Sequence, residues 1–492
     1  MRPFTPAGTK TFLLRQANII SPIPPRTIIT TTRRRLHLTT INKMSAEATP
    51  HRINITPSNI GLWSKSPTIH SQPPTAYTLL SDLLQADMHD HHVFFNKDGF
   101  HNHIPHHLLA LYGTSAPSEA LQKAYDVNAS YQRPTLPEHQ EVVSDLIQNW
   151  RDDAAKYLGK EEHYPDFLAF FKREMDSRGE GKYEQVVNEY LFAGTPEADN
   201  LLVRLYSGFL HPLIQLMYGL EWKQPAIVAE GLAQAAVHGD EIGGYLLGAE
   251  QAAKASSKPD DGMGRVVEDL LERGVRGNRK LAEAARMSDA NKVRDGVLKR
   301  AKEEAIQLAA KVKVGKEELQ ERTAEMYDSA VFMASAAALV KRNTKLPRFD
   351  FFLMHHVTSA PFFTTVNAQD WISLDTKVRL LEWKIRMDLV QYAARGAPEL
   401  SLDAITSYQP KEKKTSGTPE EIISNLHFFE DDGHSIKLAR AARICQLYYQ
   451  TRDDDYWNKV YHLIVDSVLA PGPNWVRSCG FDEAWEDIPN VE

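Results

Sequence analysis

Histidines that could bind a metal ion are the chemical feature that stands out in the sequence. The chain contains 19 histidines in 492 residues, and residues 100–112, FHNHIPHHLLALY, hold the densest group. Asn102 can cap a helix, and Pro105 is compatible with its first turn. His103 and His107 would then lie one turn apart on one face, where neutral imidazoles can bind one metal ion. The alternative is that these histidines cap the helix, face solvent or make hydrogen bonds in the core.

Three further apolar segments carry isolated histidines. His211 lies in FLHPLIQLMYG, His238 in AQAAVHGDE, and the pair His355 and His356 in FFLMHHVTSAPFF. A single histidine in an apolar helix is more often a core residue than a ligand. Several of them are harder to explain in that way, because each buried imidazole needs a hydrogen-bond partner. A shared metal ion would supply those partners at once.

Two lysines could join such a site. His434 and Lys437 are three residues apart in EDDGHSIKLARAARI and are therefore neighbours on a helix. A metal ion would repel the lysine ammonium, whereas a carbamate formed from the amine and CO₂ would be an anionic oxygen ligand. Spacing alone favours the simpler alternative of a capping histidine and an exposed lysine. Lys384 in LLEWKIRMDL is the second choice for this role, although its neighbours Glu382 and Asp388 suggest a salt-bridged helix.

Helices must position these residues, because the apolar residues recur at helical spacing and alternating strand-like runs are nearly absent. We therefore predict an all-α fold, with one large multi-helix domain over residues 76–492. The dense Lys, Glu, Arg and Ala content of residues 250–345 predicts a charged helical outer layer on this domain. Residues 44–75 are rich in Pro, Ser and Thr and predict a loop that leads into it.

The first 43 residues have a different composition. Residues 1–43 contain no Asp or Glu but several arginines, among many Thr and Pro. Such a composition is typical of a mitochondrial transit peptide. Met44 begins a segment that resembles an ordinary N-terminus. The alternative is therefore that the residues before it come from a mis-called gene start. The expected location is cytoplasmic, or mitochondrial if the extension is a transit peptide.

The composition also excludes several classes of function. The net charge is −7 and no basic stripe is interleaved with aromatics, so no nucleic-acid partner is expected. No apolar run is long enough for a membrane span. Two cysteines, Cys445 and Cys479, cannot form a disulfide framework and indicate a reducing compartment. The motifs GxGxxG, GxxxxGK[ST], HExxH, Glu-x-x-His and GxSxG are absent. The oligomeric state is not predicted.

The sequence resembles the questin-oxidase-like family of fungal secondary-metabolite oxygenases. The resemblance covers most of residues 75–490, and the motifs that carry it are FHNHIPHHLLALYG (100–113), YQRP (131–134), HPLIQLMYGLEWKQPAIVAEGLAQAAVH (211–238), LLEWKIRMDL (380–389), DDGHSIKLARA (431–441) and WVRSCGFDEAWEDIP (475–489). It implies an oxidative, Baeyer–Villiger-like opening of a ring in anthraquinone-type polyketides. NADPH is implied as a possible electron donor, whereas the missing Rossmann fingerprint argues against a flavin. Some members resemble non-haem iron oxygenases with several histidines and a carboxylated lysine, which favours Lys437.

The leading hypothesis is therefore an Fe(II)-dependent oxygenase that acts on an aromatic polyketide and O₂. The predicted ligands are His107, His211, His356, His434 and Lys437, with His103, His238, His355 and Lys384 as substitutes. The aromatic residues that could line a flat apolar pocket, or simply belong to the core, are Tyr112, Tyr218, Trp222 and Phe362. A second hypothesis is a metal-free oxygenase in which the histidines act as general bases. A third is a helical binding protein without catalytic activity.

Overall fold

The computed structural model describes residues 47–66, 73–179, 182–256, 266–410 and 417–491. The predicted N-terminal extension, residues 1–43, lies outside the described residues. The lead-in segment is partly packed rather than fully exposed: it contains the 3₁₀ helix Gly61–Lys65, and Ile55 and Trp63 are buried in the core. The backbone N–H of Leu62 on this segment donates to the Glu221 carboxylate at 2.7 Å.

The described part of the chain is all-α, as the helical spacing predicts. Extended pairing within it is limited to isolated bridges, such as Phe94 with His101. No helix among the described residues is both long and apolar enough to cross a membrane. The helices of the first half are α1 (Pro74–Asp90), α2 (Ile104–Gly113), α3 (Ser118–Ala129), α4 (Gln140–Asp153), α5 (Tyr164–Ser177), α6 (Tyr183–Leu191), α7 (Pro196–Leu205), α8 (His211–Glu221), α9 (Pro225–Val237) and α10 (Gly243–Ala255).

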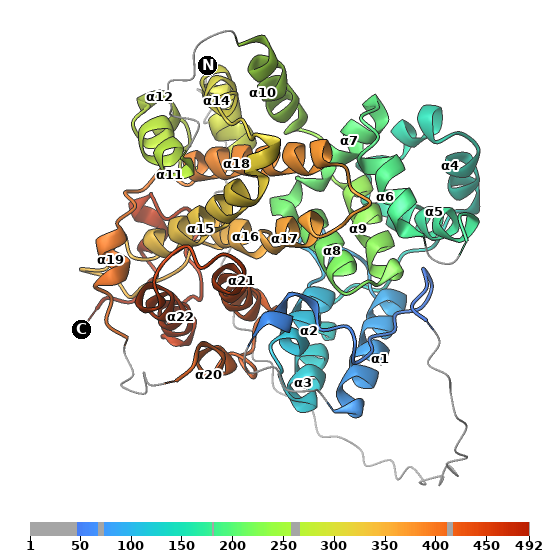
Figure 1. Cartoon of the computed structure of the whole chain (residues 1–492), viewed down its shortest axis with the longest axis horizontal. Helices are drawn as coiled ribbons and strands as arrows, with labels where there is room; N and C mark the ends of the chain where they lie inside the picture. The colour runs from blue at the N-terminus through green and yellow to red at the C-terminus, as the bar shows by residue number, and fades with distance from the viewer. Residues whose placement is uncertain (1–46, 67–72, 180–181, 257–265, 411–416, 492) are drawn as a thin grey trace, which may run out of the picture. The chain divides into compact units, whose positions relative to one another are not determined.

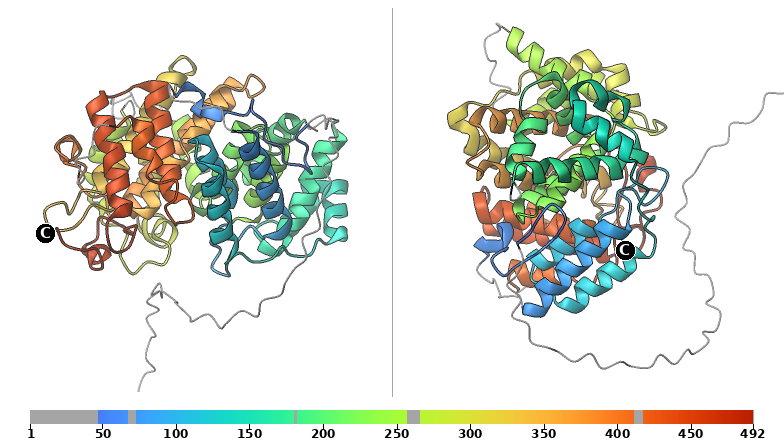
Figure 2. Two further views of the ribbon diagram at one scale, coloured as in Figure 1. Left: turned by 90° about the horizontal axis from the view of Figure 1, so that it is seen from below. Right: turned by 90° about the vertical axis from the view of Figure 1, so that its right-hand side faces the viewer.

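The second half continues with shorter helices and then returns to long ones (Figures 1 and 2). Two segments of π-helix, Leu270–Arg276 and Lys292–Val297, lie among the short ones. The α-helices are α11 (Val267–Asp269), α12 (Arg279–Ala282), α13 (Leu298–Arg300), α14 (Lys302–Ala309), α15 (Leu319–Ala337), α16 (Phe351–Thr358), α17 (Pro361–Asn367), α18 (Leu374–Ala394), α19 (Leu402–Thr406), α20 (Pro419–Ser424), α21 (His434–Tyr449) and α22 (Asp454–Leu469).

A close pair of buried helices, α8 and α9, carries two of the candidate histidines at its ends. All thirteen residues of α9 are buried, which fits its apolar sequence. Two glycines let the backbones approach: a Cβ on Gly219 would lie 2.6 Å from the Val228 nitrogen, and one on Gly231 would lie 2.7 Å from the Leu216 nitrogen. Helix α2 packs against both α8 and α21, and α16 packs against α21, so the four helices meet around one region.

The predicted outer layer over residues 250–345 does not extend to α15. Figure 1 shows α10, α12 and α14 together at the edge of the helical assembly, whereas α15 runs through it. Fifteen of the nineteen residues of α15 are buried. Its C-terminal half, SAVFMASAA, is built of small and apolar residues, which pack closely against other helices. Averaged composition over 250–345 concealed this change of character within the segment.

One buried carboxyl, Glu230 on α9, makes the stability of this core depend on pH. Its Oε2 accepts a hydrogen bond of 2.9 Å from Gln215 Nε2. Burial raises the pKa of Glu230 and Asp87 adds to this, while Lys172 and Gln215 oppose it. A carboxyl with a raised pKa keeps its proton in the folded state, so stability falls as the pH rises above the ordinary carboxyl range.

The Glu230→Gln variant removes this titration while keeping a hydrogen-bonding side chain of the same shape. We compare the free energy of unfolding of the variant with that of the unmodified protein. We expect the variant's advantage to be larger at pH 8 than at pH 5 by at least about 1 kcal/mol, since one pKa unit is worth about 1.4 kcal/mol. Urea unfolding at the two pH values measures this difference. A difference between the two proteins that does not change with pH would contradict the raised pKa of Glu230.

Candidate metal centre

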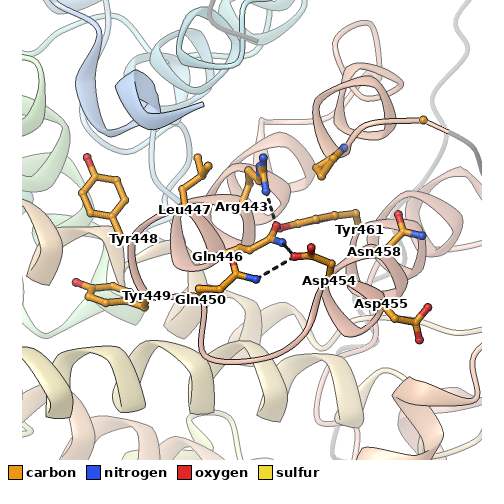
Figure 3. Close-up of a pocket in the computed structure, with 12 residues that line it drawn as sticks. Arg443, Gln446, Leu447, Tyr448, Tyr449, Gln450, Asp454, Asp455, Asn458 and Tyr461 are labelled. Carbon is orange, nitrogen blue, oxygen red and sulfur yellow. Dashed lines mark hydrogen bonds between the residues drawn. The ribbon is translucent and has the colours of Figure 1, made fainter. Parts of the chain in front are cut away.

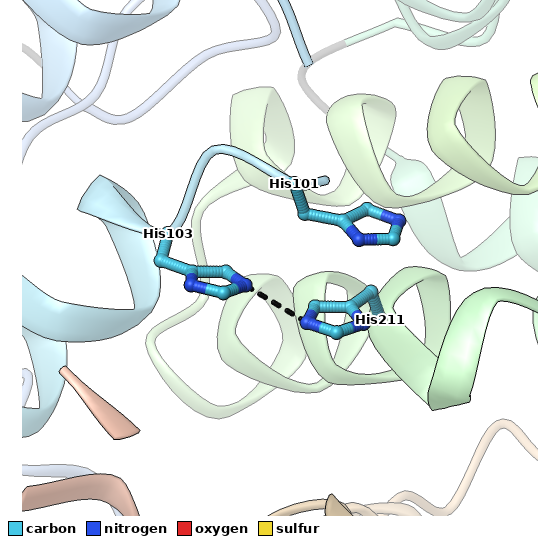
Figure 4. Close-up of side chains that lie close together, drawn as sticks. All are labelled: His101, His103 and His211. Carbon is cyan, nitrogen blue, oxygen red and sulfur yellow. Dashed lines mark hydrogen bonds between the residues drawn. The ribbon is translucent and has the colours of Figure 1, made fainter. Parts of the chain in front are cut away.

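Six buried histidines from separate parts of the chain come together where α2, α8, α16 and α21 meet. We call them the histidine cluster: His101, His103, His211, His238, His355 and His434. Each is at most 8% exposed. Figure 4 shows three of them, with His101 and His103 on the segment that leads into α2 and His211 at the start of α8. Groups of three within the cluster place a ligand atom from each residue within 4.8 Å of the others.

The ε nitrogens of the cluster face one another in pairs. His103 Nε2 lies 2.8 Å from His211 Nε2, and His355 Nε2 lies 3.1 Å from His434 Nε2. The two pairs are adjacent, because the His211 ring centroid is 4.7 Å from that of His355, and the His103 centroid is 4.5 Å from that of His434. His211, His355 and His434 place ligand atoms within 4.8 Å of one another, and His103 joins them through His211.

The δ nitrogens of two of these rings are held by backbone carbonyls. His211 Nδ1 lies 2.6 Å from the Gly208 oxygen, and His355 Nδ1 lies 2.6 Å from the Phe351 oxygen. A carbonyl oxygen can only accept a hydrogen bond, so each Nδ1 carries a proton and donates it. In the neutral imidazole the ε nitrogen then has a free lone pair.

Asp432 holds the rings of His103 and His434 in the same tautomer, with the proton on Nδ1. Its carboxylate accepts from His103 Nδ1 at 3.0 Å and also from His434 Nδ1. Burial opposes ionisation of Asp432, but His434 and His103 outweigh it and hold the pKa of this carboxyl well below its usual range. An ionised carboxylate has no proton to give, so both rings donate from Nδ1 and present bare ε nitrogens.

The paired ε nitrogens are suited to hold a cation between them. Burial, with a contribution from the Lys437 charge, lowers the pKa of His103 to about 3, and burial also lowers the pKa of His211 and His355 well below its usual value. The rings are neutral, and no proton is left to bridge either pair. Two ligand atoms that each lie about 2.1 Å from one ion, with a right angle between the two bonds, are about 3.0 Å apart. This distance matches the observed spacings. Ligand imidazoles also commonly donate their other N–H to a carbonyl or carboxylate.

The turn before α8 sets the position of His211. Gly208, Phe209 and Leu210 have φ values of 54°, 55° and 68°, a left-handed run that costs energy in the two residues with side chains. This turn aims the Gly208 carbonyl at the His211 ring. It also leaves room for the neighbouring ring, because a Cβ on Gly208 would lie 2.3 Å from His238 Nε2.

Replacing Gly208 by alanine is expected to destabilise the protein by about 1–3 kcal/mol more than replacing Gly99. Gly99 is the matched control, since its φ is also positive, at 78°, but nothing lies within 4 Å of an added Cβ. Denaturant unfolding of both variants measures the difference. Equal losses in the two variants would show that the contact with His238 costs nothing.

The remaining pair of the cluster lies beside these four rings. His101 stacks on His211 with the ring centroids 3.9 Å apart and the planes within 5°. Its Nε2 lies 2.8 Å from His238 Nε2, and His238 Nδ1 donates to the Gln234 oxygen at 2.6 Å. His101 Nε2 therefore carries the proton and donates it to His238. This pair satisfies itself and needs no cation.

Two other features of the structure lie apart from the cluster. A groove of about 770 Å³, lined by α21 and α22 residues, is spanned by hydrogen bonds of 2.9 Å from Gln446 and Gln450 to Asp454 (Figure 3). It contains none of the cluster histidines. Elsewhere, the carboxylate of buried Asp166 joins two histidines, His139 at 3.1 Å and His163 at 2.8 Å. Both donate from Nδ1, so this second group is complete without a metal ion.

Comparison with known proteins assigns the chain to one family. The questin oxidase-like family model matches residues 100–442. The chain belongs to the questin oxidase-like family. It is 34% identical over 461 residues to Baeyer-Villiger oxidase ptaJ of Pestalotiopsis fici, covering 91% of this chain and 100% of the relative. It is 35% identical over 460 residues to Baeyer-Villiger monooxygenase dmxR6 of Cryptosporiopsis sp., covering 89% and 99%. It is also 35% identical over 439 residues to questin oxidase of Aspergillus fumigatus, covering 86% and 96%.

This membership makes the chain an oxidoreductase of the oxygenase class. The hypothesis of a binding protein without catalytic activity is set aside. The matched residues 100–442 span all six histidines of the cluster. The family resemblance predicted from the sequence is thereby confirmed.

Lys437 lies one turn after His434 on α21, inside the family segment. Its side chain is 3% exposed, and among the described residues its amine has no hydrogen-bond or ion-pair partner. Burial lowers the pKa of Lys437 to about 8, although Asp432 and Asp431 oppose this. The lysine is therefore not the exposed residue that spacing alone suggested. The lowered pKa increases the fraction of neutral amine, which is the form that carbamate formation requires.

Two of the predicted ligands lie outside the cluster. His107 on α2 has its Nδ1 3.4 Å from Asn128 Nδ2 and belongs to none of the metal-binding groups. His356 donates from Nδ1 to Asp388, to which Lys384 Nζ donates at 2.5 Å. Lys384 is thus part of a buried salt bridge, the interpretation that its neighbours favoured. Two of the substitute residues reach the cluster instead: His103 in place of His107, and His355 in place of His356.

The four predicted pocket aromatics are core residues. Tyr112, Tyr218, Trp222 and Phe362 are each at most 6% exposed. Sequence reasoning missed the aromatic residues that do contact the cluster, of which Phe351 is the nearest: its ring centroid is 4.9 Å from that of His355. It also missed Asp432 and His101. The run DDGH and the first histidine of FHNH were the available signals for these two.

Proposed function

We propose that this protein is an iron-dependent oxygenase that opens a ring of an anthraquinone-like aromatic polyketide with O₂. The observation that carries the proposal is the set of four neutral imidazoles whose bare ε nitrogens face one another at 2.8 and 3.1 Å. Such an arrangement is unfavourable without a cation and favourable around one. An oxygenase needs a metal that changes oxidation state, and imidazole ligands suit iron, whereas zinc has no redox chemistry.

The proposed ligands are His103, His211, His355 and His434, and Asp432 orients two of them. His103 and His355 take the places first assigned to His107 and His356. Iron bound here would supply the redox chemistry that activates O₂. The protein supplies a dry setting, because the four rings are almost wholly buried, and it holds every ligand ring in one orientation.

Lys437 is proposed as an anionic oxygen ligand in its carboxylated form. Its neutral amine would attack CO₂, forming the N–C bond of a carbamate and releasing one proton. The amine is buried beside His434, so the resulting carboxylate would lie next to the histidine cluster. This change would replace a cation that disfavours metal binding by an anion that favours it.

The substrate class is inferred from the relatives. One of them is named questin oxidase, and others are named Baeyer-Villiger oxidases, which describes oxygen insertion beside a carbonyl. Aromatic rings adjacent to the cluster fit a flat aromatic substrate: the Phe351 and Trp475 centroids lie 5.0 and 6.1 Å from that of His434.

A second candidate function is a monooxygenase that takes electrons from NADPH, and the name of dmxR6 favours it. A monooxygenase places one oxygen atom in the product and the other in water, so it consumes two electrons from a donor. A dioxygenase places both atoms in the product and needs no external donor. The metal-free version of this hypothesis leaves the facing ε nitrogens without a cation.

Metal analysis and isotope labelling together test the proposal. We expect the purified protein to contain about one iron per chain and to convert a hydroxylated anthraquinone under ¹⁸O₂. Mass spectrometry then counts the labelled atoms in the product, and omission of NADPH decides between the two oxygenase types. Full activity after complete removal of metal by a chelator would overturn the iron proposal.

A further inference from the structure

An exposed arginine, Arg477, lies beside the histidine cluster. The Arg477 guanidinium carbon is 4.8 Å from the ring centroid of Phe351. That ring is in turn 4.9 Å from His355 and 5.0 Å from His434, measured between centroids. A single aromatic ring therefore separates the guanidinium from two of the proposed ligands.

The backbone around Arg477 is held firmly. The Val476 carbonyl accepts from the Phe351 nitrogen at 2.8 Å, and the Val476 nitrogen donates to the Phe349 oxygen at 3.0 Å. On the other side, the Ser478 nitrogen donates to the buried Asp350 carboxylate at 2.6 Å. These bonds fix both neighbours of Arg477 in the tail after α22. The side chain is thus presented from a rigid segment, although it is itself exposed.

The charge of Arg477 is not compensated by direct contact. Among the described residues, no carboxylate lies within 4.0 Å of its guanidinium and no hydrogen bond engages it. Asp432 and Asp350 attract it from a greater distance, but Asp432 is already engaged by His103 and His434. By contrast, the buried Arg440 pairs with Glu221. Arg477 thus has five free N–H donors in a planar fork that suits a carboxylate or another anionic oxygen.

We propose that Arg477 binds an anionic oxygen of the polycyclic aromatic substrate and so positions the substrate over the histidine cluster. The ring of the substrate would lie against Phe351 and Trp475, and the guanidinium would bind a phenolate or carboxylate on its edge. This inference rests on the proposed function, because it assumes an aromatic substrate at the cluster. It makes Arg477 a residue that selects for ionised over neutral substrates.

Equilibrium dialysis with two related probes tests this. Anthraquinone-2-carboxylate carries the anionic group, and anthraquinone-2-carboxamide is its neutral analogue of similar shape. We expect the unmodified protein to bind the carboxylate about 10- to 100-fold more tightly, as a charge-assisted hydrogen bond predicts. The Arg477→Gln variant should lose this preference, and Arg477→Lys should keep part of it. Arg342→Gln, at an exposed arginine after α15, controls for the change in net charge.

The outcomes separate this inference from the proposed function. If Arg477→Gln keeps the full preference for the carboxylate, Arg477 is only a side chain stacked on Phe351, and the inference fails while the proposed function stands. If the unmodified protein binds neither probe and converts no hydroxylated anthraquinone, both fail. A lost preference with unchanged thermal unfolding and unchanged iron content supports the inference.

Discussion

The His355→Asn variant is expected to lose bound iron and to lose at least about 100-fold in kcat/KM. An asparagine amide can donate to the Phe351 carbonyl in the place of Nδ1, but it has no group in the place of Nε2. The change therefore removes the proposed ligand atom and keeps the local hydrogen bond. Replacing groups that only orient a ligand typically costs 10- to 100-fold, so losing the ligand itself should cost at least as much. Iron content and steady-state kinetics measure the effect.

The matched control is His356→Asn on the next residue of the same helix. Both histidines are buried on α16, so both substitutions leave a similar void. The new amide at position 356 can still donate to Asp388, which keeps the charge of that carboxylate and of Lys384 balanced. We expect normal iron content in this variant. Equal loss of iron from the two variants would show that the choice between the paired histidines is wrong.

The Asp432→Asn variant is expected to weaken iron binding by about 10- to 100-fold. The carboxylate accepts hydrogen bonds from both His103 and His434, whereas an amide has one accepting oxygen and one donating NH₂ group. One of the two rings would then face a donor and would have to turn or move its proton to Nε2. A protonated Nε2 cannot bind a metal. Titration of the apoprotein with Fe(II) under anaerobic conditions measures the affinity.

Asp431→Asn provides the comparison for this experiment. Asp431 is half-buried like Asp432, but it accepts from the Gly433 and Ser435 nitrogens at 2.7 and 2.9 Å and so supports the start of α21. We expect this variant to lose stability and to retain iron affinity within a few-fold. If Asp431→Asn weakens iron binding as much as Asp432→Asn does, the effect comes from the shape of the loop and the assigned role of Asp432 is incorrect.

The fold class was predictable because helical spacing is a local property. Apolar residues at intervals of three and four, without alternating runs, leave few alternatives to a helical assembly. The burial of α15 was not predictable from average composition. The residues from Ser329 to Ala337 pack in the interior, but they are a short stretch among the many charged residues of 250–345.

The candidate site was predictable as a set of segments, but the choice within each segment was not. His355 and His356 both lie on a helix that is buried almost all round, so hydrophobic periodicity cannot tell which one faces the cluster. The choice between His103 and His107 could not be predicted for a different reason. It is the residue before α2, with ψ near 0°, so the rule that residues four apart share a face does not apply to it and His107.

An iron-loaded crystal gives the most direct test of the central claim, through anomalous diffraction at the iron absorption edge. We predict one strong anomalous peak lying about 2.0–2.3 Å from the ε nitrogens of His103, His211, His355 and His434. A peak that includes His107 or His356 in place of these residues would contradict the ligand assignment. The absence of any iron peak at the cluster, in crystals of protein that is active with O₂, would contradict the metal centre itself.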